Sequence, residues 1–440
     1  GVGMAGQDRS RGYIRMKKII YETHAKFAQE MDAQDPLAPF RDQFLIPQTA
    51  TQQEAIYLNG NSLGLQPRKV QAYIQQELND WAKLGVEGHL HAKNPWLPYH
   101  EQLTEQTARL VGALPIEVVV MNTLSVNLHL MMVSFYRPTA DRFKILVEKG
   151  AFPSDQYAVA SQARYHGFDP SSAIVELSPR PGETLLRTED ILKIVEEQGS
   201  SIALILIGSV NYLTGQAFDI PAITRAGHAQ GCRVGFDLAH GVGNLEVQLH
   251  DWGPDFAVWC GYKYLNGGPG ALSGCFIHER HARAPHLPRF AGWWGHNKKN
   301  RFQMPSTFDP IPGAEGWQLS NPPIFQLAAL RASLEIFDRA TMGEIRKKSV
   351  LLTGYCEFLL QQLSGSLYTL ITPQDPEARG AQLSLRIHQQ PQKVLARWLS
   401  AGIFCDFREP DIIRVAPTAL YNRYQDVFQF VQILEEDAKH

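Results

Sequence analysis

Lys263 stands at the end of an apolar segment, and its surroundings predict a reactive amine. The segment Phe256–Cys260 is almost entirely apolar, Tyr262 and Tyr264 flank the lysine, and the glycine-rich stretch 265–270 follows. A half-buried lysine with a lowered pKa is the nucleophile that forms a Schiff base with a carbonyl group. A solvated surface amine is the ordinary interpretation of any single lysine, so further residues are needed to decide.

Asp237 offers Lys263 a chemical partner. It ends the preceding apolar segment, Arg233–Asp237, and His240 lies on the turn after it. A buried carboxylate is costly unless a cation or a hydrogen-bond donor pairs with it. Pyridoxal phosphate requires a lysine for its imine and an acid that keeps its pyridine nitrogen protonated. Asp237 and Lys263 supply both groups one crossover apart, although a helix N-cap explains Asp237 equally well when it is taken alone.

Two other segments could complete a cofactor site. Residues 121–127 open a helix expected over Ser125–Phe135, where free backbone N–H groups and the Ser125 hydroxyl can bind a phosphate. In the segment 150–155, Phe152 can stack on a flat heterocycle, and Asp155 follows it. Ser125 and Asp155 could also be plain helix caps.

A scaffold that brings several strand ends together is predicted by the order of segments between Val118 and His278. Strands are expected at Val118–Met121, Lys144–Val147, Ala173–Leu177, Ile202–Ile207, Arg233–Asp237, Phe256–Cys260 and Gly274–His278. Helical segments lie between several of them, at Ser125–Phe135, Ser154–Tyr165, Thr188–Gln198 and Pro221–Gly231. This alternation predicts an α/β fold with a mostly parallel, seven-stranded sheet covered on both faces. Ligands of such sheets bind at the carboxyl ends of the strands.

The pattern changes after Pro323 and predicts a second unit. Helices are expected at Ile324–Arg339, Glu344–Leu363 and Gln392–Leu399, with strands at Gln382–Ile387 and Ile412–Val415. We therefore expect a large cofactor-binding domain over residues 71–322 and a smaller α+β domain over 323–440. Residues 16–70 are expected to associate with the small domain, and residues 1–15 to be a loose arm or a remnant added for expression.

The composition points away from several classes of protein. The chain of 440 residues has 42 basic and 44 acidic side chains, which is unlike the basic surface of a nucleic-acid binder. Its apolar segments are too short to cross a membrane, and no signal peptide is recognisable. Five widely spaced cysteines without a C-x-x-C pair indicate free thiols and a cytoplasmic protein. His278 and His281 do not form an H-E-x-x-H motif, so no metal site is expected.

Seven motifs follow one another in an order that identifies a family. They are Leu58-Asn-Gly-Asn-Ser-Leu-Gly-Leu65, Phe152-Pro-Ser-Asp155, Gly235-Phe-Asp-Leu-Ala-His240, Tyr262-Lys-Tyr-Leu-Asn266, Gly292-Trp-Trp-Gly-His296, Ser320-Asn-Pro-Pro323 and Ile413-Arg-Val-Ala-Pro417. Together they resemble kynureninase, a family of fold type I (aspartate aminotransferase-like) pyridoxal-phosphate enzymes. The resemblance extends from about Tyr57 to Tyr421.

The resemblance implies a role for each matching residue. Lys263 would bind the cofactor and then move protons, Asp237 would hold the pyridine N–H with Asp155 near the ring, and Phe152 would stack on it. Tyr262 is the candidate general acid. The residues expected at the phosphate or elsewhere beside the cofactor are Leu124, Ser125, Pro153, Ser154, Gly208, His240 and Tyr262. Ser125 and Gly208 depart from the family's usual threonine and serine, so Ser125 keeps a hydroxyl and Gly208 offers only backbone.

The remaining roles concern the substrate and a second subunit. Arg414 would bind the substrate carboxylate through its bidentate fork. Ser62, His89 and Asn321 would line the substrate side, and Trp293 and Asn321 would reach the site from the partner subunit of a homodimer. The implied reaction is hydrolysis of the Cβ–Cγ bond of L-kynurenine or 3-hydroxy-L-kynurenine to an anthranilate and L-alanine, in tryptophan catabolism and NAD biosynthesis. His89 and Asn321 are the types found in members that prefer the 3-hydroxy substrate.

Three alternatives stay open at this point. Gly60-Asn-Ser-Leu-Gly64 fits the G-x-S-x-G elbow of serine hydrolases, with Ser62 as nucleophile, although the strand before it, Ile56–Leu58, is very short. Another fold type I lyase or transaminase would share the cofactor motifs. A non-enzymatic binding module of the same fold would not need Lys263, Asp237 and Arg414 together.

Overall fold

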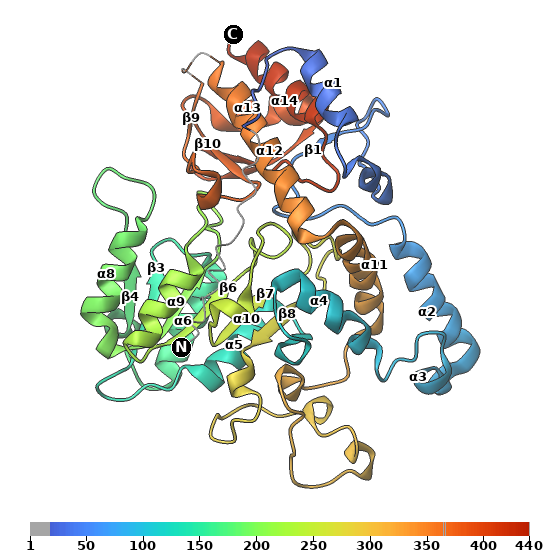
Figure 1. Ribbon diagram of the computed structural model, residues 1–440, viewed down its shortest axis with the longest axis vertical. Coiled ribbons are helices and arrows are strands. Elements are labelled where there is room, and N and C mark those ends of the chain that lie inside the picture. Colours follow the sequence, from blue (N-terminus) through green and yellow to red (C-terminus); the bar gives the residue numbers. More distant parts are fainter. Residues whose placement is uncertain (1–17, 364, 366, 440) are drawn as a thin grey trace, which may run out of the picture.

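A central sheet covered by helices forms the larger part of the molecule, and a smaller unit of helices and strands lies above it (Figure 1). The structure is a computed structural model and describes residues 18–439 except 364 and 366. The smaller unit contains the C-terminal end together with helix α1 (Ala25–Ala33). Helices α2 (Val70–Leu84) and α3 (Gly88–His91) lie at the edge of the molecule, beside α11 (Ile324–Ala340). The prediction for residues 1–15 lies outside the described residues.

Seven strands form the central sheet, in the order β2-β8-β7-β6-β5-β3-β4. Their bounds are β2 (Val118–Val120), β3 (Lys144–Glu148), β4 (Ile174–Leu177), β5 (Ile202–Gly208), β6 (Arg233–Asp237), β7 (Phe256–Trp259) and β8 (Gly274–Ile277). Strand β8 runs antiparallel to both of its neighbours, and the other pairs are parallel. The predicted mostly parallel, seven-stranded sheet is therefore confirmed.

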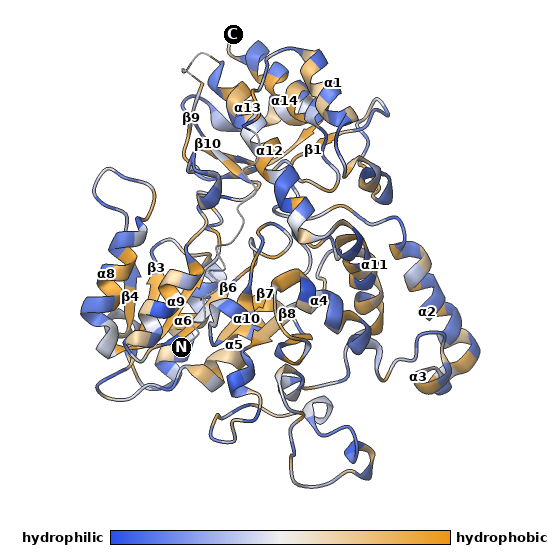
Figure 2. Cartoon of the chain, viewed as in Figure 1, coloured by the Kyte–Doolittle hydropathy of each residue, from blue (hydrophilic) through white to orange (hydrophobic). Residues whose placement is uncertain are grey.

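Helices between the strands cover the sheet, as predicted. They are α5 (Leu124–Phe135), α6 (Pro153–Tyr165), α7 (Pro170–Ala173), α8 (Thr188–Gln198), α9 (Ile220–Ala229) and α10 (Leu249–Trp252). Strands covered on both faces are apolar along their whole length instead of alternating with polar residues. Figure 2 shows this pattern, because the central strands are coloured as hydrophobic while the helices combine both colours.

The parallel strands deliver polar residues to one edge of the sheet. Glu148, Gly208 and Asp237 are the last residues of β3, β5 and β6, and Gly208 is directly paired with Asp237. Strand β7 ends at Trp259, four residues before Lys263. In the sheet, β3 lies between β5 and β4. This order brings Glu148 to the same edge as Gly208, Asp237 and Lys263.

The smaller unit packs helices on a four-stranded antiparallel sheet of order β12-β13-β10-β9. Its helices are α12 (Met342–Gln361), α13 (Pro391–Ser400) and α14 (Tyr424–Asp437). Its strands are β9 (Tyr368–Leu370), β10 (Leu383–Ile387), β12 (Asp406–Arg408) and β13 (Ile412–Val415). Of these, α12, α13, β10 and β13 were predicted from the sequence, whereas α14, β9 and β12 were not.

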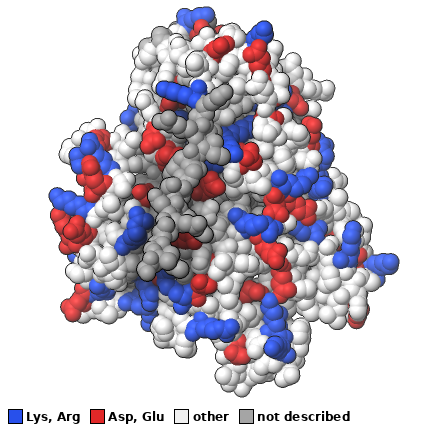
Figure 3. Space-filling model, in the orientation of Figure 1, with Lys and Arg blue, Asp and Glu red and all other residues white. Residues whose placement is uncertain are grey.

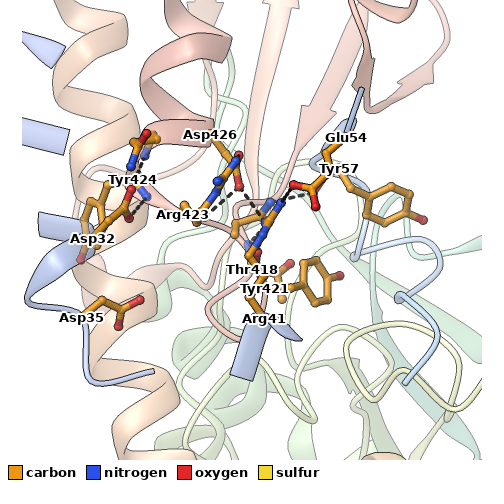
Figure 4. Close-up of polar contacts among 12 residues, drawn as sticks. Asp32, Asp35, Arg41, Glu54, Tyr57, Thr418, Tyr421, Arg423, Tyr424 and Asp426 are labelled. Atoms are coloured by element: carbon orange, nitrogen blue, oxygen red, sulfur yellow. Dashed lines mark hydrogen bonds and ion pairs between the residues drawn. The ribbon is translucent and has the colours of Figure 1, made fainter. Parts of the chain in front are cut away.

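Charged contacts tie the N-terminal segment to the start of α14 (Figure 4). Asp32 accepts hydrogen bonds from the backbone N–H groups of Tyr424 and Gln425, at 2.7 and 3.1 Å. Arg41 donates to Asp426 at 3.2 Å and to Glu54 at 2.9 Å. Beyond these contacts, β1 (Ile56–Tyr57) pairs in parallel with β11 (Ile403–Phe404) of the smaller unit. The segment that carries the Ser62 motif is therefore fixed to the smaller unit.

Helix α11 packs on α2 and α4 (Thr104–Val111) and also contacts α12. It thus lies between the two units, and the boundary expected at residues 322/323 stays a prediction. All five cysteines are buried and free of disulfide bonds, as predicted. Among the described helices, none has the length and apolar character that a membrane span requires. On the face shown in Figure 3, basic and acidic side chains are interspersed.

Candidate active site

A cavity of about 120 Å³ opens at the carboxyl edge of the central sheet. Its walls are the strand ends, the first turns of α5 and α6, and the loop after β7. The lining residues are Leu124, Ser125, Glu148, Phe152, Ser154, Asp155, Gly208, Val210, Tyr212, Asp237, Ala239, His240, Tyr262 and Lys263. The structure therefore brings together every residue predicted to surround the cofactor from within one subunit, apart from Pro153, which is the first residue of α6.

Lys263 lines this cavity from the loop that follows strand β7. Strand β7 is buried throughout, and the carbonyl of the adjacent Tyr262 accepts a hydrogen bond of 2.9 Å from the backbone of Gly64. Burial, and to a smaller degree the nearby Arg414, lowers the pKa of Lys263. In the described part of the chain its Nζ makes no hydrogen bond or ion pair, and it lies 5.1 Å from the centroid of the Tyr262 ring. Lys263 is thus a free amine that is suited to attack a carbonyl group.

Asp155 and Asp237 contribute two neighbouring carboxyl groups to the same cavity. One oxygen of Asp237 accepts a hydrogen bond of 2.8 Å from the backbone of Ala239. Burial, together with the neighbouring Asp237, raises the pKa of Asp155 well above its usual range. The Oδ1 atom of Asp155 is buried and has no hydrogen-bond partner. Among the described residues neither carboxyl group forms an ion pair, and the protonated nitrogen of a pyridine ring is a cationic donor that would satisfy them.

An anion site lies where two helices begin. Ser125 is in the first turn of α5 and Ser154 is in the first turn of α6, and their hydroxyl oxygens are 2.8 Å apart. Thr123 precedes α5 without capping it through its side chain, so the first N–H groups of that helix are left for another acceptor. Two helix N-termini and two hydroxyl groups therefore converge, which is an arrangement that favours a phosphate.

The Tyr262 hydroxyl and the His240 ring complete the cavity. Burial, and then the nearby Cys260 thiol, raises the pKa of Tyr262 to about 12, so its hydroxyl keeps its proton and can donate it in a hydrogen bond. Burial, and then the charge of Lys263, holds the pKa of His240 well below its usual value, which leaves a neutral imidazole. Its Nδ1 atom is buried without a partner, so His240 has hydrogen-bonding capacity to offer a ligand.

Phe152 presents its ring at the mouth of the cavity, where 44% of the residue is exposed. It meets Tyr212 edge to face, with the ring centroids 5.4 Å apart and an angle of 80° between the planes. This contact leaves a face of Phe152 available for stacking on a flat ligand.

Arg414 is fully buried and is held in place by two neighbours. Its Nε and Nη2 atoms both donate to the carboxylate of Asp406, the former over 2.6 Å, and its Nη1 atom donates to the carbonyl of Tyr212 over 2.8 Å. A guanidinium group has five N–H donors. One N–H on each terminal nitrogen is therefore left over, and this pair matches the two oxygens of a carboxylate.

Besides Pro153 and Arg414, four predicted residues do not line the cavity of this single chain. Ser62 sits on the turn after β1, where its backbone donates to Asn59 over 3.0 Å. His89 lies in α3, bonded through Nδ1 to the Val86 carbonyl at 2.8 Å. Trp293 is 38% exposed, and Asn321 is also exposed. Trp293 and Asn321 were expected from a partner subunit, so their exposure agrees with that expectation without testing it.

Glu148, Tyr212 and Asp406 belong to the site but were not predicted from the sequence. The strand before Glu148 was ended at Val147, although an acid directly after an apolar segment was the same signal that identified Asp237. Tyr212 lies in an irregular loop after β5, and Asp406 lies in a strand of three residues. Neither of these two had a local pattern that would have identified it.

The G-x-S-x-G motif has a structural role. A side chain on Gly64 would lie 2.4 Å from the carbonyl of Lys263, and a side chain on Gly60 would lie 2.2 Å from the Tyr421 hydroxyl. Both glycines are therefore needed for close packing next to the lysine loop. The Ser62 hydroxyl has no hydrogen bond to a histidine among the described residues, so the arrangement of a serine hydrolase is absent there.

Among the described residues, two groups outside the cavity have the spacing of metal ligands: Glu117, His250 and His278, and His100, Glu101 and Glu315. His250 Nδ1 lies 3.0 Å from the Glu117 carboxylate. The Nδ1 atom of His278 accepts from the backbone of Arg280 at 3.2 Å, so its Nε2 carries the proton when the ring is neutral and faces the His250 carbonyl at 3.2 Å. These contacts form a hydrogen-bond network that joins the residue before β2, helix α10 and the residue after β8.

Comparison with solved structures agrees with the fold. A cysteine desulfurase from Escherichia coli superposes with a TM-score of 0.73 at 18% identity, covering 92% of this chain and 98% of that one. A cysteine desulfurase from Thermococcus onnurineus gives a TM-score of 0.70 at 17% identity, covering 88% of this chain and 95% of that one. At such low identity these similarities show the fold alone.

Comparison with known sequences identifies the family as well as the fold. The chain is 64% identical to the kynureninase of Myxococcus xanthus, over 96% of this chain and 99% of the relative. It is 60% identical to the kynureninase of Koribacter versatilis, over 95% and 98% of the two chains, and 49% identical to that of Nematostella vectensis, over 93% of each. Residues 345–434 match the family described as the kynureninase C-terminal domain. With this identity over nearly its whole length, and with a cavity that joins a free lysine to a pair of carboxyl groups, the chain belongs to the kynureninase family.

Proposed function

We propose that this enzyme hydrolyses the Cβ–Cγ bond of L-kynurenine or 3-hydroxy-L-kynurenine, with pyridoxal phosphate as cofactor. The products are anthranilate or its 3-hydroxy form and L-alanine, as in tryptophan catabolism and NAD biosynthesis. The observation that carries the proposal is the unpaired amine of Lys263 in the same cavity as Asp155, whose buried oxygen lacks a partner. Family membership supplies the reaction, and the cavity supplies the groups that the reaction needs.

The residues of the cavity suit pyridoxal phosphate. Lys263 would bind its aldehyde carbon, Asp237 and Asp155 its ring nitrogen, and Ser125 its phosphate, while Phe152 would cover one ring face. When bound, the cofactor supplies an electron sink for the negative charge that develops on the substrate. The further residues that we place around it are Leu124, Pro153, Ser154, Gly208, His240 and Tyr262.

Lys263 and Tyr262 divide the proton transfers between them. Because its pKa is lowered, the Lys263 amine can accept the proton from the substrate Cα and return a proton afterwards. Water adds to the Cγ carbonyl, the Cβ–Cγ bond breaks, and Cβ gains a proton to give alanine. Tyr262, which stays protonated, donates a hydrogen bond to the carbonyl oxygen as charge develops on it.

Arg414 is the group that we assign to the substrate carboxylate. Asp406 and the Tyr212 carbonyl hold its guanidinium, and one N–H of each terminal nitrogen stays available. A guanidinium held in this way would bind the substrate carboxylate without spending binding energy on ordering the arginine.

We further propose a homodimer in which Trp293 and Asn321 complete the partner's site. An apolar groove of about 980 Å³ runs between α2, α11 and the loop after Lys263. Leu78, which lines this groove, is 39% exposed, and Trp81, whose ring centroid lies 6.2 Å from that of the lining residue Phe325, is 58% exposed. Exposed apolar surface of this extent is typical of an interface between subunits. Ser62 and His89 would then line the substrate side once two chains come together.

The substrate preference is proposed from His89 and Asn321, which favour 3-hydroxy-L-kynurenine. Buried polar groups matched to a hydroxyl discriminate strongly against an analogue that lacks it. The ratio of kcat/KM on the two substrates tests this preference, and a higher value on plain kynurenine would contradict it. A cytoplasmic location is proposed as well, because five unpaired buried thiols suit a reducing compartment.

The test of the main function is incubation of the cofactor-loaded enzyme with each substrate. Anthranilate or 3-hydroxyanthranilate and an equal amount of alanine are expected, with no product from Lys263→Ala. The absence of both anthranilates would refute the function, while pyruvate or an oxo acid would point to another lyase or a transaminase of the same fold.

A further inference from the structure

Glu148 is a buried acid in the cofactor cavity that the reaction described above does not use. Its residue is 5% exposed, and its carboxyl group stands at the end of β3, between β5 and β4 in the sheet. It lines the cofactor cavity and also a second cavity of about 240 Å³ behind it. Asp155 and Gly208 line both cavities too, so these three residues form the wall between them.

The carboxyl group of Glu148 is fixed at both oxygens. Oε1 accepts a hydrogen bond of 3.1 Å from the backbone N–H of Gly208, and Oε2 accepts one of 3.0 Å from the side-chain amide of Asn211. The amide of Asn211 cannot turn round, because its oxygen already accepts from the backbone of Leu213 and Thr214, each at 2.9 Å. Glu148 is therefore held in one orientation by donors that are themselves fixed.

Gly208 leaves the room that this arrangement requires. A side-chain carbon on residue 208 would lie 2.9 Å from Oε1 of Glu148, which is closer than such contacts allow. Gly208 thus leaves space for the carboxyl group of Glu148, which lines the same cavity as Asp155 and Asp237.

Three carboxyl groups in one enclosed region cannot all be ionised without a cation. Burial raises the pKa of Glu148 to about 7, against the lowering effect of its two hydrogen bonds. The pKa of Asp155 is raised by burial, by Asp237 and by Glu148. The titratable groups that face this cluster from the surrounding elements are Asp155 and Tyr157 of α6, Glu176 of β4, Tyr212 after β5, Asp237 and His240 at the end of β6, and Tyr262 and Lys263 after β7.

We propose that Glu148 is a positioning residue of the ring-nitrogen site, which holds a proton in the empty enzyme and releases it when a cationic ring nitrogen binds beside Asp155 and Asp237. The proton passes to a water molecule in the rear cavity. This cavity is lined by Glu148 itself and, at about 240 Å³, is large enough to hold water. Ionised Glu148 then adds a negative charge behind Asp155 and favours the protonated form of the ring. The inference rests on the proposed cofactor and deepens its site.

The test follows the protonation of Glu148 directly and does not depend on turnover. The enzyme is labelled with carbon-13 at its glutamate carboxyl groups, and the infrared band of the neutral acid is measured against pH. One labelled glutamic acid is expected to lose its proton at about pH 7 in the cofactor-free enzyme. Addition of pyridoxal phosphate should lower this midpoint by about one pH unit, since a cation approaches the cluster.

Two variants assign the band. Glu148→Gln should remove it, whereas Glu176→Gln should keep it, because Glu176 lines the same rear cavity but is exposed. If the glutamine variant does not fold, Glu148→Asp is used instead. It keeps an acid at this position, but the acid is an aspartate and carries no label, so the band should again disappear. A band that survives both Glu148 changes, or a midpoint that the cofactor leaves unchanged, would overturn the proposal.

The holoenzyme gives a second measurement. The visible absorption of the bound cofactor depends on pH, and the midpoint of this change should lie at a lower pH in Glu148→Gln than in the unmodified enzyme. Glu176→Gln should have the same midpoint as the unmodified enzyme. Equal midpoints in all three proteins would overturn the proposal. An enzyme that shows these titrations but forms no anthranilate would refute only the proposed reaction.

Discussion

Asp406 and Arg414 face each other as paired residues of the antiparallel strands β12 and β13, and Asp406 takes two of the five N–H donors of the arginine. The ion pair is buried on the arginine side, where 1% of the side chain is exposed. The pairing between the strands, rather than the arginine alone, therefore sets the direction in which the remaining donors point.

Asp406→Asn is expected to weaken substrate binding. The amide can accept only one of the two hydrogen bonds, so the Arg414 fork loses its fixed orientation. A hydrogen bond to a charged group contributes about 1.5 to 3 kcal/mol, so KM for kynurenine should rise about tenfold to a hundredfold with a smaller change in kcat. Steady-state kinetics test this, with Asp411→Asn as the control, because Asp411 forms a looser, partly exposed pair with Arg386 at 3.5 Å in the same sheet. A fall in kcat at constant KM would argue against a role in binding.

Lys263→Ala should abolish the reaction while the fold is kept. The variant loses both the attachment of the cofactor and the group that moves the Cα proton, so kcat should fall at least on the order of 10³-fold. Product formation and the visible absorption of the bound cofactor are the measurements. Lys149→Ala is a suitable control, since this exposed lysine lies directly after β3. Comparable turnover by both variants would exclude Lys263 as the reactive amine.

Asp255 should be a main contributor to the stability of the strand that leads to Lys263. It is 1% exposed and lies 2.8 Å from His228, 2.8 Å from His281 and 3.0 Å from Arg280. Asp255→Ala leaves these groups without their partner and should lower the free energy of unfolding by about 3 to 5 kcal/mol. Denaturant unfolding tests this, with the exposed Asp251→Ala as control.

The contribution of Asp255 should also depend on pH. Burial alone would raise its pKa, but the histidine and arginine partners hold the pKa of Asp255 well below its usual 3.8. A lowered pKa in the folded state stabilises the fold above the unfolded value, and this contribution is lost as the pH falls through the folded value. The stability difference between the wild type and Asp255→Ala should therefore shrink below about pH 4. A difference that is constant through this acid range would contradict a role for the ion pairs.

In the cofactor-free enzyme, Glu148 should make the free energy of unfolding depend on pH in the opposite direction to Asp255. Its pKa is raised from 4.5 to about 7 in the folded state, so between these values the folded chain binds more protons at Glu148 than the unfolded chain. The free energy of unfolding should therefore fall as the pH rises through this window. Glu148→Gln should lack this part of the slope. Parallel curves for the two proteins from denaturant unfolding would show that Glu148 is already ionised.

A shared active site predicts that two inactive variants restore activity when they are combined. Lys263→Ala lacks the reactive amine, and Asn321→Ala lacks an exposed side chain that we place in the partner's site. A mixed dimer would contain one site with both residues intact, so dissociation and reassociation of an equal mixture should recover roughly a quarter of the wild-type activity. A mixture no more active than its components, although mixed dimers are present, would place Asn321 outside the partner's site.

The elements that were predicted from the sequence are those whose own residues carry a clear local pattern. Strands β5 and β6 were predicted almost residue by residue, because a short continuous apolar segment between polar helices is typical of a strand buried on both faces. Helix α14 was missed, and part of its N-terminal capping comes from Asp32, at the other end of the chain, in addition to the local Asp426. Strand β12 has only three half-buried residues and is defined by its pairing with β13.

The sequence alone determined which residues could do the chemistry: a lysine, an aspartate and a hydroxyl group at strand ends, in the order of one enzyme family. Their closeness follows from a parallel sheet, whose strand ends meet at one edge. The tertiary structure decided what surrounds them, because the sheet order places Glu148 of β3 beside Gly208 of β5, and the pairing of β12 with β13 places Asp406 on Arg414. These contacts join segments that are distant in the chain, so no local pattern of residues could have revealed them.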